Sequence, residues 1–233
     1  MDKQYAEALD AVDATAVAVG QGAQINEDSN ATGVYIATCT GPVEERRQEY
    51  IFLRDTIAEI EAANLITRLM YSSRLAVLKK QLDAIPIEEK WADQVAPNLV
   101  TTVGGNNMLD NHLSGSAYTA AWYMGLISAT SYTTGPALTD TMASHGGWAE
   151  DVNYSNAARP TTAWSAAASK SKSLSAGLVF NMNDSTTIKG CFLNTDSTKN
   201  GSTGILFSAG LFTGGDQPVV NGNTLTVTYT ASV

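Results

Sequence analysis

Residues 42–85 read PVEERRQEYIFLRDTIAEIEAANLITRLMYSSRLAVLKKQLDAI, and this stretch decides the fold of the front half of the chain. After Pro42 no glycine or proline interrupts it, and Pro86 follows its last residue. A proline fits the first turn of a helix and ends a helix that it follows, while acidic side chains in the first turns favour the positive end of the helix dipole. The stretch therefore predicts helical structure from Pro42 to Ile85.

Two helical arrangements fit this stretch. A single helix would be about 65 Å long at a rise of about 1.5 Å per residue. The run Tyr71-Ser72-Ser73 is its weakest point, so two helices folded as a hairpin are the alternative. The sequence leaves both open.

An apolar row lies in the second part of the stretch. Its four residues follow one another at spacings of 3, 4 and 3, which is the heptad pattern of a packed seam: Leu75, Leu78, Leu82 and Ile85. Such a row needs a covering element, which can come from the same domain or from another chain. We treat it as a candidate oligomer seam and expect a homo-oligomer, either a trimer or a dimer.

The chain before the helical stretch is expected to form an arm, residues 1–41. Glycines break a weakly helical start, a polar loop follows, and the apolar run Val34–Cys39 has no local strand partner. A lone strand is marginal in water, so we expect the arm to order against a neighbour. Residues 42–95 are expected to be the helical segment with a linker at its end.

The pattern changes after residue 95. Residues 1–95 carry 16 acidic and 9 basic side chains, whereas residues 96–233 carry only 7 and 5 and are rich in Thr, Ser, Gly, Ala and Asn. Short apolar or alternating runs recur there, separated by turn sequences such as Asn200-Gly201 and Asn221-Gly222. They predict an antiparallel β-sandwich or jelly-roll-like domain over residues 96–233, and an α+β fold overall. The run WYMGLI (residues 122–127) is expected to be a strand buried on both faces.

Composition excludes several classes of function. The formal net charge of −9 argues against nucleic acid, because phosphate binding needs clustered Lys and Arg. No apolar run reaches the roughly 20 residues that span a bilayer, so we expect no membrane partner. Cys39 and Cys191 lie far apart, form no CxxC pair, and are expected to be buried thiols.

Catalytic and metal-binding patterns are not found in the sequence. The two histidines are His112, beside Leu113 in an expected short helix, and His145, in a Gly-rich turn before Trp148. Neither has a recognisable partner, and no nucleophile elbow, phosphate loop or paired metal-ligand spacing occurs. We therefore expect no catalytic residue, no metal and no cofactor.

Two groups of residues were weighed as ligand sites. The loops 181–184 and 194–196 offer oxygen atoms for calcium but lack the EF-hand pattern, so Asx turns are expected. The aromatic residues could form a sugar-stacking platform, but a β core with an interface rim is expected instead. This set is Trp122, Trp148, Trp164, Tyr118, Tyr123, Tyr132 and Tyr154.

Five segments of the β-rich half together resemble a domain that recurs in tailed-bacteriophage virion structural proteins. They are VAPNLVTTVGGNNMLDNHLSGSAYTAAWYMGLI, DTMASHGGWAE, YSNAARPTTAWSAA, GCFLNTDSTKNGSTGILFSAGLF and VVNGNTLTVTYTASV. The resemblance covers about residues 95–233, carries no catalytic motif, and implies a component of a phage particle. It does not cover the first 94 residues, which are expected to decide where the β-domain is attached.

The expected function is therefore that of a non-enzymatic virion protein, made in the host cytoplasm and assembled into the particle. We expect a capsid decoration or head-fibre component attached by its N-terminal region, with the major capsid protein as partner. This reading is favoured because fibres usually show long repeats, and none is found here. The alternative is a tail or tail-fibre component that contacts other tail proteins and whose β-domain binds a host-surface glycan.

Overall fold

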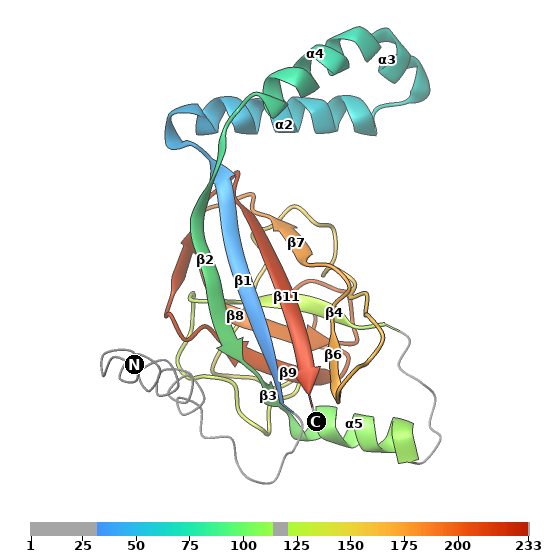
Figure 1. Cartoon of the computed structure of the whole chain (residues 1–233), viewed down its shortest axis with the longest axis vertical. Coiled ribbons are helices and arrows are strands. Elements are labelled where there is room, and N and C mark those ends of the chain that lie inside the picture. Colours follow the sequence, from blue (N-terminus) through green and yellow to red (C-terminus); the bar gives the residue numbers. More distant parts are fainter. Residues whose placement is uncertain (1–31, 114–120, 233) are drawn as a thin grey trace, which may run out of the picture.

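The computed structural model describes residues 32–113 and 121–232, which form two antiparallel β-sheets, a projecting helical hairpin and one separate helix (Figure 1). The sheets face each other and enclose the main core, so the body is β-sandwich-like. The fold is α+β, as the sequence predicted.

The first sheet joins the two ends of the described chain. Its strands are β1 (Thr32–Pro42), β2 (Ile87–Pro97), β6 (Ser171–Ser173), β7 (Leu178–Asn181) and β11 (Thr224–Ser232). Their order is β2-β1-β11-β6, and β7 also pairs with β11. In β1 and β11 alternate side chains are buried, because successive residues of a strand point to opposite faces. The buried set is Tyr35, Ala37, Cys39, Leu225, Val227 and Tyr229, and the threonines of β11 lie between them on the outer face.

The second sheet has β8 at its centre. Its strands are β3 (Leu99–Val100), β4 (Tyr123–Ser128), β5 (Glu150–Asp151), β8 (Thr186–Asn194), β9 (Leu206–Leu211) and β10 (Gln217–Val219). The order is β3-β9-β8-β4-β5, with β10 also pairing with β8. Strand β4 is buried on both faces, which confirms the prediction from WYMGLI. A small second core, which includes Ile127, Met142, Trp148 and Phe192, covers its outer side.

Contacts between the sheets hold the sandwich together. The hydroxyl of Tyr35 in β1 lies 2.6 Å from Ser208 Oγ in β9. Within the first sheet, the ring centres of Tyr35 and Tyr229 lie 4.5 Å apart. The core between the sheets combines Phe180 from the first sheet with Met124 and Leu193 from the second. Helix α5 (Thr102–Leu113) lies beside β9 and contains the short helix expected around His112 and Leu113.

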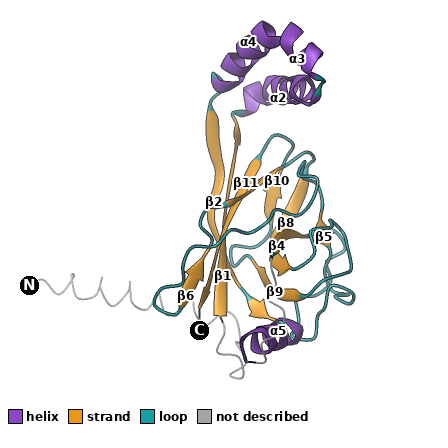
Figure 2. Ribbon diagram, turned by 90° about the vertical axis from the view of Figure 1, so that its right-hand side faces the viewer, coloured by secondary structure: helices purple, strands orange, loops and turns teal. Residues whose placement is uncertain are grey.

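A helical hairpin projects from the sandwich on a two-stranded ribbon (Figure 2). Strands β1 and β2 pair antiparallel and continue to the hydrogen bond from Val43 N to Pro86 O, 3.1 Å long. Between them lie the 3-10 turn η1 (Glu44–Arg46) and the helices α2 (Arg47–Ala62), α3 (Leu65–Met70) and α4 (Ser72–Asp83). Asn64 caps α3, because its side chain accepts a hydrogen bond from Thr67 N. Of the two arrangements left open by the sequence, the hairpin is found, but it has three helices instead of two. The helices break at Tyr71, as expected, and also at Ala63-Asn64.

The expected division of the chain is wrong in one respect. Residues 32–42 and 87–97, assigned to the arm and to the linker, are strands of the sandwich. Val34–Cys39 has no partner nearby in sequence because its partners are residues 87–97 and 224–232. The expected boundary at residue 96 therefore cuts through one sheet, while residues 1–31 of the expected arm lie outside the described residues.

Candidate functional site

The largest group of exposed apolar side chains among the described residues lies at the free end of the hairpin. We call it the tip patch, and it consists of Leu65, Ile66, Leu69, Met70 and Tyr71. The exposed fractions of the first four are between 65% and 76%, and that of Tyr71 is 41%. Soluble proteins rarely leave contiguous apolar surface of this kind uncovered, so the tip patch is a candidate interaction surface.

The other end of the hairpin rests on the sandwich. Arg54 in α2 donates a hydrogen bond of 3.2 Å to Asn221 Oδ1 in the turn before β11. Gly222 follows with a φ of +92°, and a Cβ atom there would lie 3.3 Å from the side chain of Ile51. A positive φ and a close neighbour both favour glycine at this place. These contacts hold the base of the hairpin and leave its tip free.

The candidate oligomer seam lies inside the hairpin. Leu78 and Ile85 are buried against Leu53 and Ile57 of α2, and Leu75 and Leu82 pack on the same cluster. The heptad row is a packing surface, and its covering element within the chain is α2. The structure therefore gives the same-domain alternative for this row, while the oligomeric state of the chain stays a prediction.

Basic side chains accompany the tip patch. Residues 62–82 contain Arg68, Arg74, Lys79 and Lys80 and no acidic residue, in a chain with a formal net charge of −9. Lys79 pairs with Glu61 at 2.6 Å, and both side chains are exposed. Residues 62–82 are thus both apolar and basic, while the exposed acidic residues Glu59 and Glu61 precede them at the end of α2.

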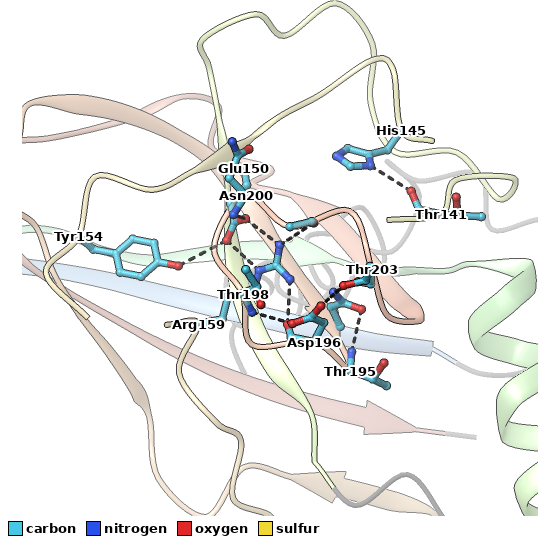
Figure 3. A network of polar contacts seen from close by, with 12 residues as sticks. Thr141, His145, Glu150, Tyr154, Arg159, Thr195, Asp196, Thr198, Asn200 and Thr203 are labelled. Carbon is cyan, nitrogen blue, oxygen red and sulfur yellow. Dashed lines mark hydrogen bonds and ion pairs between the residues drawn. The ribbon is translucent and has the colours of Figure 1, made fainter. Parts of the chain in front are cut away.

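A buried polar network occupies the loop end of the sandwich (Figure 3). Arg159 donates to Glu150 through Nε at 2.9 Å and through Nη2 at 2.8 Å. It also donates to the backbone oxygen of Asp196 at 2.8 Å and to that of Gly201 at 3.2 Å. Asn200 N donates to the same Glu150 carboxylate at 2.5 Å. The pair therefore fastens the β8–β9 loop to the segment that follows β5.

This network is structural. The Arg159 and Glu150 side chains are 0% and 2% exposed, so neither can reach a substrate. A buried charge needs a partner and further hydrogen bonds to offset the loss of water, and the loop backbone supplies them. The sequence analysis missed this pair. Residues 96–233 contain only 12 charged residues in 138 positions, and this scarcity was the signal that Arg159 could have a buried charged partner.

Tyr154 and Lys199 extend the network toward the surface. Lys199 Nζ donates to the backbone oxygens of Tyr154 at 2.7 Å and of Asn156 at 3.1 Å, and it lies 3.9 Å from the centre of the Tyr154 ring. Burial lowers the pKa of Lys199. Burial, and next the charge of Glu150, raise the pKa of Tyr154 well above its usual range. The raised pKa keeps the Tyr154 hydroxyl protonated near neutral pH.

The histidine that the structure describes fully is a turn residue. His145 Nδ1 lies 3.0 Å from Thr141 O, and its ring lies 4.3 Å from that of Trp148. Trp148 Nε1 in turn donates to Asp140 at 2.9 Å. His112 falls in α5, and its side chain lies outside the described part. Within residues 32–113 and 121–232, no three His, Cys, Asp or Glu side chains gather as a metal site.

The two loops weighed for calcium use their oxygen atoms internally. Asp184 Oδ1 accepts from Ser185 N at 2.7 Å, and Asp196 Oδ1 accepts from Thr198 N at 2.8 Å. The Thr203 hydroxyl also donates to the Asp196 carboxylate. That bond, and next those from Thr198, lower the pKa of Asp196. Asx-type turns account for these residues, as the sequence predicted.

The aromatic residues take separate places in the core. Trp122 packs on Phe207 at 5.1 Å between ring centres, and Trp164 packs on Tyr229 at 5.9 Å. Trp148 packs on Phe192, Tyr154 packs on Phe180, and Lys189 lies over Tyr132. Since each of these five side chains has a different partner, they do not form one stacking platform; Tyr118 lies outside the described residues.

Both cysteines are free and buried, as expected. Burial raises the pKa of Cys39 to about 12, and it raises the pKa of Cys191 further. A thiol is nucleophilic as the thiolate, so neither is prepared for chemistry near neutral pH.

No family model matches this chain, and no curated protein matches it. Among the described helices, none is long and apolar enough to cross a membrane. Among the described residues, the tip patch is the largest group of apolar side chains without an internal partner.

Proposed function

We propose that the chain is a non-enzymatic structural component of a tailed-phage particle, as a capsid decoration or head-fibre protein. The resemblance of residues 95–233 to a recurring virion domain supports the proposal that the chain is part of a phage particle. The projecting hairpin with its exposed tip patch supports the proposal that the chain acts by contacting other proteins.

The observation that carries the proposal is the position of the tip patch. Its five large apolar side chains stand on a hairpin that a two-stranded ribbon holds away from the sandwich (Figure 2). By contrast, Glu150, Arg159 and His145, the side chains suited to acid–base chemistry in the sandwich, have internal partners. An exposed apolar surface that projects from a domain whose polar side chains bond internally is typical of a protein that binds other proteins, and not of one that catalyses a reaction.

The N-terminal attachment expected from the sequence takes a more specific form. Residues 32–42 belong to the sheet, so within residues 32–97 the projecting surface is the hairpin between β1 and β2, whereas residues 1–31 lie outside the described residues. The surface of the hairpin is therefore the first place to look for the contacts that incorporate the protein.

The test is the number of copies in purified particles of the phage that carries the gene, measured on a stained gel against the major capsid protein. A count on the order of hundreds supports a capsid component, whereas about six to twelve copies supports the tail component, because the two assemblies follow different symmetries. Absence from purified particles would overturn the proposal. Turnover of a capsular polysaccharide or of peptidoglycan by the pure protein would overturn its non-enzymatic part.

A further inference from the structure

The two arginines at the tip of the hairpin differ from the other four arginines of the chain. Each of those four pairs with a carboxylate of the same chain at 2.8 or 2.9 Å, and the pairs are Arg46–Glu49, Arg47–Glu44, Arg54–Asp55 and Arg159–Glu150. Within residues 32–113 and 121–232, no hydrogen bond or ion pair joins the guanidinium group of Arg68 or Arg74 to another residue. Both residues are exposed, so their guanidinium groups are available to a partner.

The exposed apolar residues of α3 form one stripe beside Arg68. At about 100° per residue, an arc of about 140° around the helix axis contains four of them. They are Leu65, Ile66, Leu69 and Met70. The side away from the stripe carries Thr67, the one residue of α3 that is partly covered. Arg68 lies about 60° from Leu65 around the axis, so its charge borders the stripe.

The composition of the tip is that of a protein interface. Interface cores are enriched in Tyr, Met and Arg and depleted in Lys, Glu and Asp. Residues 62–78 contain two Arg, one Met and one Tyr, and no Lys, Glu or Asp. A bilayer is a poorer fit, because a chain with a formal net charge of −9 is repelled by anionic lipid headgroups. Composition and charge therefore favour a protein as the partner.

The acidic residues near the tip do not cancel its positive charge. Glu61 bonds with Lys79 at 2.6 Å, so this pair is neutral overall. The remaining charges between residues 59 and 80 are one negative, that of Glu59, and three positive. Opposite charges attract at contact distance, so the complementary surface is one that carries carboxylates.

We propose that the tip patch docks in an apolar groove of another virion protein, and that carboxylates on the rim of this groove bind Arg68 and Arg74. An apolar helix face in a groove is a recurrent mode of recognition, in which residues at i and i+4 act as anchors. Two pairs in the stripe have this spacing, Leu65–Leu69 and Ile66–Met70. The inference rests on the proposed function and names the chemistry of the partner surface.

The two parts of the contact have different roles. The apolar side chains supply affinity, because docking removes their exposed surface from water. The guanidinium groups supply orientation, since the planar fork of an arginine binds a carboxylate through two parallel hydrogen bonds. Helix α3 is about 9 Å long at 1.5 Å per residue, so a groove of about that length is sufficient.

Incorporation into particles tests the docking. A phage that lacks the gene is grown on cells that supply the wild-type chain or a variant, and the copies per particle are counted. Leu69→Glu places a charge in the stripe, and we expect at least a 10-fold loss of copies. Leu109→Glu is the matched control, because it changes another exposed leucine, in α5 beside β9, and should leave the count unchanged. Circular dichroism of the purified variants checks that both fold.

The charged part of the contact is tested by crosslinking. Arg68→Lys keeps the positive charge and introduces an amine, which a carbodiimide joins to a neighbouring carboxylate as an amide. In purified particles that carry this variant, we expect a crosslink from position 68 to an Asp or Glu of another virion protein, identified by mass spectrometry. The wild-type chain is the control, because a guanidinium group does not react in this way.

Four results would overturn the inference. Full incorporation of Leu69→Glu would exclude the tip patch as the docking surface, and the absence of any crosslink from position 68 would exclude the acidic rim. A crosslink from position 68 to a second copy of the chain would show self-association instead. Co-sedimentation of the wild type with vesicles of phosphatidylserine and phosphatidylcholine, lost in Leu69→Glu, would show that a bilayer covers the tip.

The same experiment separates the inference from the proposed function. A wild-type chain that is absent from particles refutes the proposed function, and the inference that rests on it falls with it. A wild type that is present, together with an equal count for Leu69→Glu, refutes the inference alone.

Discussion

Arg159 and Glu150 form a bidentate ion pair, with bonds of 2.9 Å and 2.8 Å, at a place where neither side chain is more than 2% exposed. The Lys189–Asp216 pair, in contrast, has an aspartate whose side chain is 50% exposed. The two pairs differ in the availability of water, which decides how much each contributes to stability.

Replacing Glu150 with Gln should destabilise the protein by about 3–5 kcal/mol, because Arg159 would remain buried without a counter-charge. Asp216→Asn makes the same carboxylate-to-amide change in the exposed pair and should cost about 1 kcal/mol or less. Urea unfolding followed by tryptophan fluorescence measures both. Equal costs for the two variants would show that the buried pair does not fasten the β8–β9 loop.

Removing the hairpin should leave the sandwich folded. Val43 N and Pro86 O already meet at 3.1 Å, so a short Gly-containing turn can replace residues 44–85. The lost contacts with the sandwich include the Arg54–Asn221 bond and the packing of Ile51 near Gly222. We expect a cooperative melt and a β-type circular dichroism spectrum.

A chain beginning at residue 96 provides the contrasting case. It lacks β1 and most of β2, and therefore exposes one edge of β11 and the buried rings around Tyr229. We expect it to be insoluble or to melt without cooperativity. A stable product would mean that the first sheet needs only β11, β6 and β7.

Within the hairpin, Leu78→Ala and Val77→Ala should differ sharply. Leu78 is buried against α2, so its truncation should cost about 2–5 kcal/mol of hairpin stability. Val77 is exposed in the single chain, and its truncation should cost about 0.5 kcal/mol or less in the hairpin itself. Amide hydrogen exchange in α2 and α4 reports the difference.

The cysteines should not react in the native state at pH 8. The pKa of about 12 for Cys39 and the still higher pKa of Cys191 leave almost no thiolate, and both side chains are covered. A colorimetric thiol reagent should detect neither residue until urea unfolds the sandwich, and both afterwards. Fast labelling of either one in native buffer would contradict the burial described above.

The fold class could be predicted because its signals are local. The residue types in 42–85, the two prolines around them and the Asn-Gly turns each specify structure within a few positions. The heptad row showed that a packing surface existed, but spacing says nothing of which helix covers it. The turn at Asn64, where α2 gives way to α3, is what allows the same chain to cover its own row.

The sheet pairing and the tip patch could not be predicted in the same way. Both strands that pair with β1 lie far from it in the sequence. Strand β2 is an edge strand, where charged residues are common, and its charged residues make its sequence look like that of a linker. Exposed and buried leucines in 65–78 look alike in sequence. The path of the hairpin alone decides that Leu69 faces water while Leu78 does not.

The pairing of β1 with β11 also sets the order of events during synthesis. Thr32 lies opposite Ser232 and Thr40 opposite Thr224, so the first described strand has to wait for the last one to leave the ribosome. The helices of the insert pack mainly on one another, apart from the contacts of Ile51 and Arg54 with the turn before β11, and they can fold while the sandwich is still incomplete. Closure of the body is thus a late event that joins the two ends of the chain around an insert that is already formed.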